Sequence, residues 1–190
     1  ARVVAERFAH AARWRIDASQ FDSPDLATTE QIERDWWREL IADVLELDHA
    51  QSMAAFDFLW DHYAQPQSWR FFDDAAECLR RLGEAGVRWI IASNFDERLR
   101  AICRREPLLA KAERVFPSSE VGWRKPSGRF YDYIRREMAV SPEKLLMVGD
   151  DSLADVEGAR RAGWRAMLLR RDDQRVETGA GVLTSLADLP

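Results

Sequence analysis

Short apolar runs alternate with amphipathic stretches along the second two-thirds of the chain. The apolar runs predict strands at 87–92, 114–116, 145–149 and 165–169. The amphipathic stretches predict helices at 72–84, 96–105, 127–138 and 154–162. Strands that alternate with helices are typical of a parallel sheet with helices packed on both faces. We therefore expect an α/β, doubly wound parallel sheet over residues 67–190.

The first 66 residues carry only helical patterns. Apolar side chains recur at helical spacing in a first segment, at Val3, Val4, Phe8, Ala11 and Ala12. Thr28 and Gln31 resemble a capping box at the start of a second helix, and a third helix is expected from Ser52. Residues 1–66 therefore form a separate helical unit beside the α/β unit.

Three tryptophans of this helical unit allow two interpretations. Trp36, Trp37 and Trp60 fall on apolar helix faces, where large aromatic side chains pack between helices. The same side chains could instead line a substrate pocket. Both interpretations stay open at the level of sequence.

The apolar run 145–149 ends in a cluster of acids, Asp150, Asp151 and Asp155. Ligands of parallel sheets bind beyond the carboxyl ends of the strands, and carboxylates gathered there repel one another unless a cation offsets them. Mg²⁺, which prefers oxygen ligands and accompanies phosphate, is the simplest such cation. The alternative is an acidic loop that caps the following helix, because Asp is common at helix starts.

Two further polar segments complete an ordered set with these acids. Ser93 and Asn94 follow the strand at 87–92, and Lys125 precedes the helix at 127–138. Among 28 Lys and Arg residues only three are Lys, and the compact lysine ammonium is not interchangeable with a guanidinium. Ser93 could bind a phosphoryl group by hydrogen bonds, Lys125 by charge and Asp150 through a metal. The alternative for Lys125 is a solvated surface side chain.

In this order the segments resemble motifs II, III and IV of the haloacid dehalogenase-like hydrolase superfamily. Ser93-Asn94 is similar to motif II, Lys125-Pro126 to motif III, and Gly149-Asp150-Asp151 with Asp155 to motif IV. The resemblance runs from about Trp69 to Pro190, and the segment 91–99 is similar to a branch of phosphatases. It implies a Rossmann-type sheet with strand order 5-4-1-2-3, and it makes residues 1–66 a partial helical cap that closes over the site.

The resemblance also implies a role for each candidate residue. Ser93 and Lys125 would be catalytic, and together with Asn94 they would bind the phosphate. Asp150 and Asp151 would ligate Mg²⁺, and Asp155 would orient that site. The implied activity is Mg²⁺-dependent hydrolysis of a small phosphate monoester through an aspartyl-phosphate.

One motif of the superfamily is missing from this sequence. The nucleophile is the first Asp of an Asp-x-Asp motif at the tip of the first, central strand, and no such segment occurs here. Asp57 and Asp61, and likewise Asp73 and Asp74, lie inside helical patterns. We therefore expect a chain that lacks roughly 40 N-terminal residues, judged by usual element lengths. We also expect unpaired edges on the strands that carry motifs II and IV, and no hydrolytic turnover.

Three alternatives to this phosphatase remain. A 2-haloacid dehalogenase usually carries Ser-Asn where this chain has Gly149-Asp150. A non-catalytic binding protein with this fold is compatible with the missing nucleophile. A response-regulator receiver places its acids early and its lysine late, which is the reverse of the order here.

The amino-acid composition argues against several kinds of partner and site. The hydrophobic fraction of 46% and charged fraction of 32% are those of a globular protein, and a net charge of −5 argues against a nucleic-acid partner. Cys78 and Cys103 lack metal-ligand spacing, so we expect free thiols in a reducing, cytoplasmic compartment. The histidines form no recognisable site, and neither a signal peptide nor a membrane span is evident.

Overall fold

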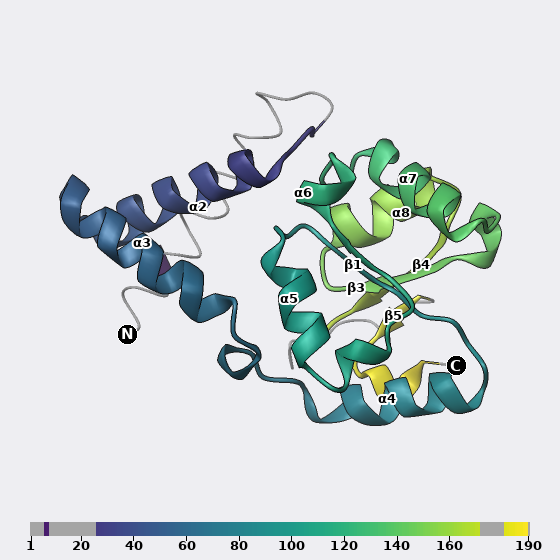
Figure 1. The fold of residues 1–190 in the computed structure, drawn as a ribbon. Helices are drawn as coiled ribbons and strands as arrows, with labels where there is room; N and C mark the ends of the chain where they lie inside the picture. Colours follow the sequence, from purple (N-terminus) through teal and green to yellow (C-terminus); the bar gives the residue numbers. More distant parts are fainter. Residues whose placement is uncertain (1–5, 8–25, 172–180, 190) are drawn as a thin grey trace.

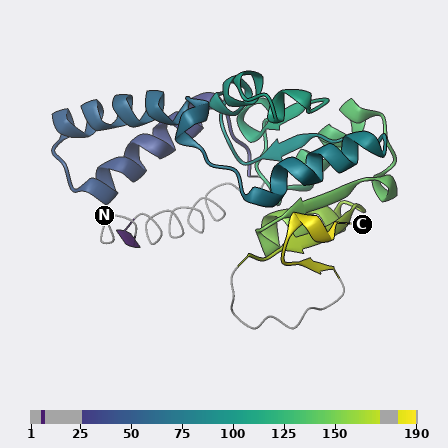
Figure 2. The ribbon, with the colours of Figure 1, turned by 90° about the horizontal axis from the view of Figure 1, so that it is seen from below.

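The computed structural model describes residues 6–7, 26–171 and 181–189. It consists of a hairpin of two long helices beside an α/β core (Figure 1). Seen from below, the hairpin extends away from the core (Figure 2). Apart from residues 6 and 7, which are helical, the first expected helix with Val3, Val4, Phe8, Ala11 and Ala12 lies outside the described residues.

The hairpin pairs α2 (Glu30–Leu45) with α3 (His49–Tyr63). The expected capping box of Thr28 and Gln31 is wrong, because the cap is the Thr29 side chain, which accepts the Ile32 N–H, whereas Thr28 donates to the buried Glu33. Helix α3 begins three residues earlier than expected, since Asp48 accepts the Gln51 N–H and caps it. The hairpin encloses a small cluster of buried apolar side chains, Ile41, Phe56 and Trp60.

The core contains two separate parallel sheets. Strand β1 (Ile91–Ser93) pairs with β2 (Val115–Pro117). Strand β3 (Leu146–Gly149) pairs with β4 (Arg165–Leu169), which pairs with β5 (Val182–Leu183). Within the described residues no strand joins β1 to β3, so each of them keeps an unpaired edge. The expected α/β class is confirmed, with interrupted pairing between the strands of motifs II and IV.

Helices cover both faces of these strands, with α7 and α8 on one side and α4 on the other (Figure 1). The α-helices of the core are α4 (Asp73–Glu84), α5 (Arg98–Arg105), α6 (Ser118–Val121), α7 (Gly128–Met138) and α8 (Gly158–Arg161). A π-helical segment, η4 (Ser152–Glu157), precedes α8. The 3₁₀ turns are η1 (Pro66–Ser68), η2 (Leu109–Lys111), η3 (Pro142–Lys144) and η5 (Leu186–Asp188).

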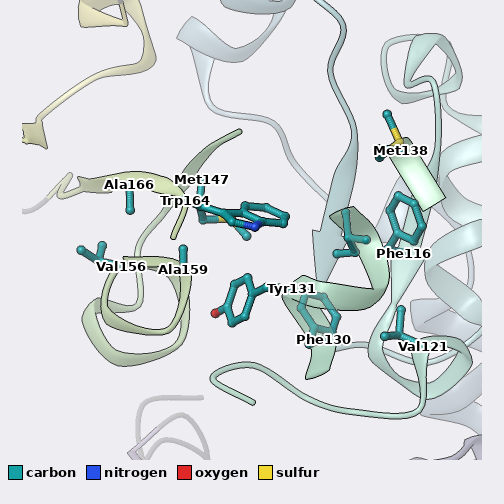
Figure 3. Close-up of a cluster of buried hydrophobic side chains, with 11 residues drawn as sticks. Phe116, Val121, Phe130, Tyr131, Met138, Met147, Val156, Ala159, Trp164 and Ala166 are labelled. Carbon is teal, nitrogen blue, oxygen red and sulfur yellow. The ribbon is translucent and has the colours of Figure 1, made fainter. Parts of the chain in front are cut away.

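Helix α7 connects the two sheets through the main hydrophobic cluster (Figure 3). Its residues Phe130, Tyr131 and Ile134 are fully buried, as the helical spacing of its apolar positions predicts. The cluster includes Phe116 from β2 and Met147 from β3. Side-chain packing on α7 therefore holds together two sheets that share no backbone hydrogen bonds.

A short backbone pairing attaches the helical hairpin to the core. The Thr28 N–H donates to the Gly122 carbonyl over 2.9 Å, and the Arg124 N–H donates to the Leu26 carbonyl over 2.8 Å. Ala27 and Trp123 form an antiparallel bridge between these bonds. The start of α2 is thereby placed against the loop that carries Lys125.

Candidate functional site

Lys125 lies between the ends of β1 and β3, the two strands whose facing edges have no partner among the described residues. Its ammonium forms an ion pair with Asp155, which follows β3, and its Nζ lies 3.4 Å from the carbonyl oxygen of Ala92 in β1. The Lys125 side chain is only 9% exposed and that of Asp155 only 6%. The solvated-surface interpretation of Lys125 is therefore wrong, and the structure places its charge inside the site.

Asn94 holds the backbone of Lys125. Asn94 Oδ1 accepts the Lys125 N–H over 2.7 Å, and Asn94 Nδ2 donates to the Lys125 carbonyl over 3.0 Å. The Lys125–Pro126 peptide is cis. Ser93, half-buried, ends β1 one residue earlier. Helix α5 begins only at Arg98, so the Asn94 amide does not lie in the first turn of a helix.

Asp155 is fixed by more than its ion pair. Its Oδ2 accepts the Asp151 N–H over 3.0 Å, while its Oδ1 faces Lys125. A Cβ added to Gly149 would lie 2.1 Å from Asp155 Oδ2, a distance that no side chain tolerates. Gly149 is thus required because the carboxylate that orients Lys125 folds back against the end of β3.

Asp150 and Asp151 have different environments. Asp151 Oδ1 accepts the N–H groups of Leu153 and Ala154, each over 2.8 Å, so this carboxylate caps the π-helical segment. The capping interpretation of the acidic cluster therefore holds for Asp151. Asp150 is exposed, and its carboxylate makes no hydrogen bond to any described residue.

Two cavities flank this acidic loop. One of about 160 Å³ is lined by Asp151, Lys125 and Asn94 together with Trp36 and Trp37 of α2. The other, of about 690 Å³, is lined by Asp150 and Gly149. Its remaining lining includes Arg70, Phe71 and Phe72, which precede α4, and Arg170, which follows β4. The structure thus brings Asn94, Lys125 and Asp151 to one cavity, which Asp155 supports through Lys125. Asp150 opens toward the other, and Ser93 lines neither.

The three tryptophans of the helical unit have different environments. Trp36 and Trp37 line the smaller cavity and pack edge to face with ring centroids 5.1 Å apart. Trp60 packs within the hairpin against Phe56, and the Arg98 guanidinium lies 3.5 Å above its ring. Trp60 is therefore a packing residue, whereas Trp36 and Trp37 also form a cavity wall.

Sequence reasoning missed two residues of this cavity. Arg124 donates to Glu33 through Nε and Nη2, both over 2.7 Å, in a bidentate pair whose side chains are 14% and 6% exposed. Thr28 also donates to Glu33. The position of Arg124 next to Lys125 was an available signal, but Glu33 lies 91 residues away, and no local pattern links the two.

The acids considered as substitute nucleophiles lie elsewhere. Asp57 and Asp61 belong to α3, and Asp73 and Asp74 to the first turn of α4, so neither pair follows a strand. Asp74 accepts hydrogen bonds from Arg171, Ser185 and the Leu186 N–H. These bonds hold the pKa of Asp74 well below its usual range. Asp74 therefore fastens the C-terminal segment to α4.

The carboxylates of the acidic loop are the candidate ligands for a metal ion. No group of three or more His, Cys, Asp or Glu side chains suited to an ion occurs in the described part of the chain. Mg²⁺ in phosphate sites is commonly bound by only one or two carboxylates, with water and substrate phosphate as its other ligands. The carboxylates of Asp150 and Asp151 match that oxygen chemistry.

Two further expectations concern thiols and membranes. Cys78 and Cys103 are free and buried, and burial raises the pKa of the Cys103 thiol to about 11. Among the described helices, none is both long and apolar enough to cross a membrane.

The chain is similar in sequence to known hydrolases. A human (Homo sapiens) protein named haloacid dehalogenase-like hydrolase domain-containing protein 3 is 30% identical over 140 residues, 72% of this chain and 56% of that protein. Ribulose-1,5-bisphosphate 5-phosphatase from Halopiger xanaduensis is 30% identical over 118 residues, 62% of this chain and 48% of that protein. The chain therefore spans about half the length of these curated relatives.

The fold is also shared with solved structures. The crystal structure of a dehalogenase aligns with a TM-score of 0.70 and 21% identity, covering 99% of this chain and 80% of that one. The family model described as haloacid dehalogenase-like hydrolase matches residues 1–163. The chain therefore belongs to the haloacid dehalogenase-like hydrolase family.

Proposed function

We propose that this chain is part of a Mg²⁺-dependent phosphatase for a small phosphate monoester, which acts through an aspartyl-phosphate. The observation that carries the proposal is the buried Lys125 ammonium between the ends of β1 and β3. Phosphoryl transfer depends mainly on positioning and on stabilisation of negative charge, and a buried cation beside a cavity supplies both.

Each candidate residue has a distinct part in this proposal. Lys125 neutralises charge on the phosphoryl oxygens, and the Asn94 N–H donates a hydrogen bond to them. Ser93 lines neither cavity, so its hydroxyl would have to reach the phosphoryl group from the end of β1. Asp155 keeps the ammonium in place. Asp150 and Asp151 line different cavities, so together they would hold Mg²⁺ only at the acidic loop between the two cavities, where the ion would add positive charge beside the phosphoryl group. Because Asp57, Asp61, Asp73 and Asp74 lie in helices and none of them follows a strand, the chain alone is expected to have no turnover.

The main rival is a 2-haloacid dehalogenase, and a non-catalytic binding protein is the other. Fold similarity does not separate them, since solved relatives include a dehalogenase and curated relatives include a phosphatase. The exposed Asp150 carboxylate favours the phosphatase, because hydrolysis of a haloacid uses no metal whereas a strand-tip carboxylate suits Mg²⁺. Buried free thiols support action in a reducing compartment such as the cytoplasm.

The decisive test is calorimetric binding of inorganic phosphate to the 190-residue chain with and without Mg²⁺. We expect Mg²⁺-dependent binding that Lys125→Met weakens at least about tenfold, the loss of one charge-assisted contact. Lys111→Met, which removes an exposed lysine, is the matched control. Asp150→Asn changes an exposed side chain and should remove only the Mg²⁺ dependence.

Other results would overturn parts of the proposal. Binding of 2-chloropropionate without Mg²⁺, together with no phosphate binding, would establish the dehalogenase instead. Turnover of 4-nitrophenyl phosphate that Asp150→Asn abolishes would show that a carboxylate of this chain replaces the missing nucleophile. Phosphate binding unaffected by Lys125→Met would remove the central role of the lysine.

A further inference from the structure

The smaller cavity has a polar end and an aromatic wall. Lys125, Asn94 and Asp151 form the polar end, where the proposed phosphoryl group binds. The remaining lining includes Trp36 and Trp37 from α2 and the apolar side chains Leu26, Pro126, Leu153 and Ala154. A phosphate ester bound at Lys125 would therefore place its organic group among these apolar and aromatic side chains.

Arg124, the guanidinium that lines this cavity beside the aromatic wall, is already neutralised. Both carboxylate oxygens of Glu33 accept hydrogen bonds from Arg124, which leaves the guanidinium fork occupied. Glu33 itself is buried, and the Arg124 guanidinium lies 5.6 Å from the Trp36 ring centroid. The wall therefore offers no unpaired positive charge to a second anionic group, while it offers aromatic surface to an uncharged one.

The size of the cavity sets a limit on its occupant. Its volume of about 160 Å³ is close to that of an apolar protein cavity of roughly 150 Å³ that binds benzene. Because this volume includes the polar end that would hold the phosphoryl group, the organic group can be no larger than a phenyl ring without displacing α2 or the loop of Arg124. The edge-to-face arrangement of Trp36 and Trp37 provides a ring face and a ring edge for such a group.

We propose that this cavity selects a phosphate monoester whose organic group is flat, uncharged and about the size of a phenyl ring, and that Trp36 is a specificity-determining residue. The inference rests on the proposed function, because it assumes that phosphate binds at Lys125. The substrate class differs from that in the name of the Halopiger ribulose-1,5-bisphosphate 5-phosphatase, which specifies a substrate with a second phosphate.

The test compares esters that share one phosphate and differ in the organic group. Calorimetry of the 190-residue chain with Mg²⁺ would measure methyl phosphate, phenyl phosphate and 4-carboxyphenyl phosphate. Phenyl phosphate should bind about fivefold to tenfold more tightly than methyl phosphate, the gain of one aromatic contact. The carboxylate of the third ester should remove this gain, because it meets no unpaired cation.

Variants of the hairpin aromatic side chains test which residue causes the preference for phenyl phosphate over methyl phosphate. Trp36→Ala should reduce the phenyl-to-methyl ratio to about one while methyl phosphate affinity changes less than about twofold, and Trp36→Phe should keep most of the ratio. Phe58→Ala, which removes a 69% exposed aromatic of the same hairpin, is the matched control and should change nothing. If Trp36→Ala does not fold, the wild-type ratio and Trp36→Phe still decide the question.

The failures are distinguishable. Equal binding of methyl and phenyl phosphate would overturn the inference and leave the proposed function standing. A phenyl preference that survives in folded Trp36→Ala would overturn the role of Trp36. Tighter binding of the carboxyphenyl ester would overturn the requirement for an uncharged group. No binding of any ester, with none of inorganic phosphate, would refute the proposed function itself.

Discussion

The α/β core and the helical hairpin are stabilised in different ways. In the core, eleven buried residues form one cluster around α7, with Phe130, Tyr131 and Ile134 fully buried. The hairpin buries a cluster of only three residues, and two of its other aromatic side chains, Phe58 and Tyr63, are exposed. Apolar burial thus dominates the core, whereas the hairpin has much less of it.

Polar contacts compensate at the boundary between these regions. Arg124 and Lys125 are neighbours in sequence, yet Arg124 pairs with Glu33 of the hairpin while Lys125 pairs with Asp155 of the core. One loop therefore fixes both the hairpin and the candidate phosphate site. A structural change in α2 would be transmitted to Lys125 through a single peptide unit.

The largest expected effect comes from the core. Phe130→Ala should lower the free energy of unfolding by about 3–5 kcal/mol, because it removes a fully buried ring and leaves a cavity between the two sheets. Phe56→Ala removes an equally buried ring of the hairpin, but hydrogen exchange should increase mainly in α2 and α3. Urea denaturation combined with hydrogen exchange measures both. Equal, global loss of protection in the two variants would remove the distinction between the regions.

The Arg124–Glu33 ion pair gives the next effect. Arg124→Met should destabilise the attachment of α2 by about 3 kcal/mol, since the buried Glu33 carboxylate would lose its bidentate partner. Hydrogen exchange of α2 and urea denaturation at neutral pH measure the change. The double variant Arg124→Met/Glu33→Leu, which buries neither charge, should recover most of that loss. If the double variant is as unstable as the sum of the single ones, the ion pair is not what holds α2.

Much of the core could be predicted from local pattern. The helices expected at 72–84 and 127–138 occur at Asp73–Glu84 and Gly128–Met138, and the strand expected at 165–169 occurs at those residues. Strand β1 was expected from residue 87 but begins at Ile91. Its pairing with β2 starts only at that residue, and its other edge has no partner among the described residues.

The site was only partly predictable for a related reason. Lys125 stood out because lysine is rare here, and the glycine at 149 belongs to a pattern that the chain shares with its family. The Arg124–Glu33 pair and the assignment of Asp150 and Asp151 to different cavities depend on contacts between distant segments. Hydrophobic periodicity predicts which face of a helix or strand is buried, but it does not predict which side chains of distant segments contact that face.

The smallest predicted effect concerns a polar contact at the edge of the core. It shows that polar contacts stabilise the core as well as the attachment of the hairpin. Asp74 of α4 binds Arg171, Ser185 and the Leu186 N–H, and these bonds lower its pKa. A depressed pKa in the folded state stabilises the protein above the unfolded pKa of roughly 3.9, and that stability is lost as the pH falls below it. Between pH 7 and pH 3 the wild type should therefore lose about 1 kcal/mol more than Asp74→Asn does. Urea denaturation at both pH values measures this difference, and equal losses would show that charge on Asp74 contributes nothing to fastening the segment 181–189.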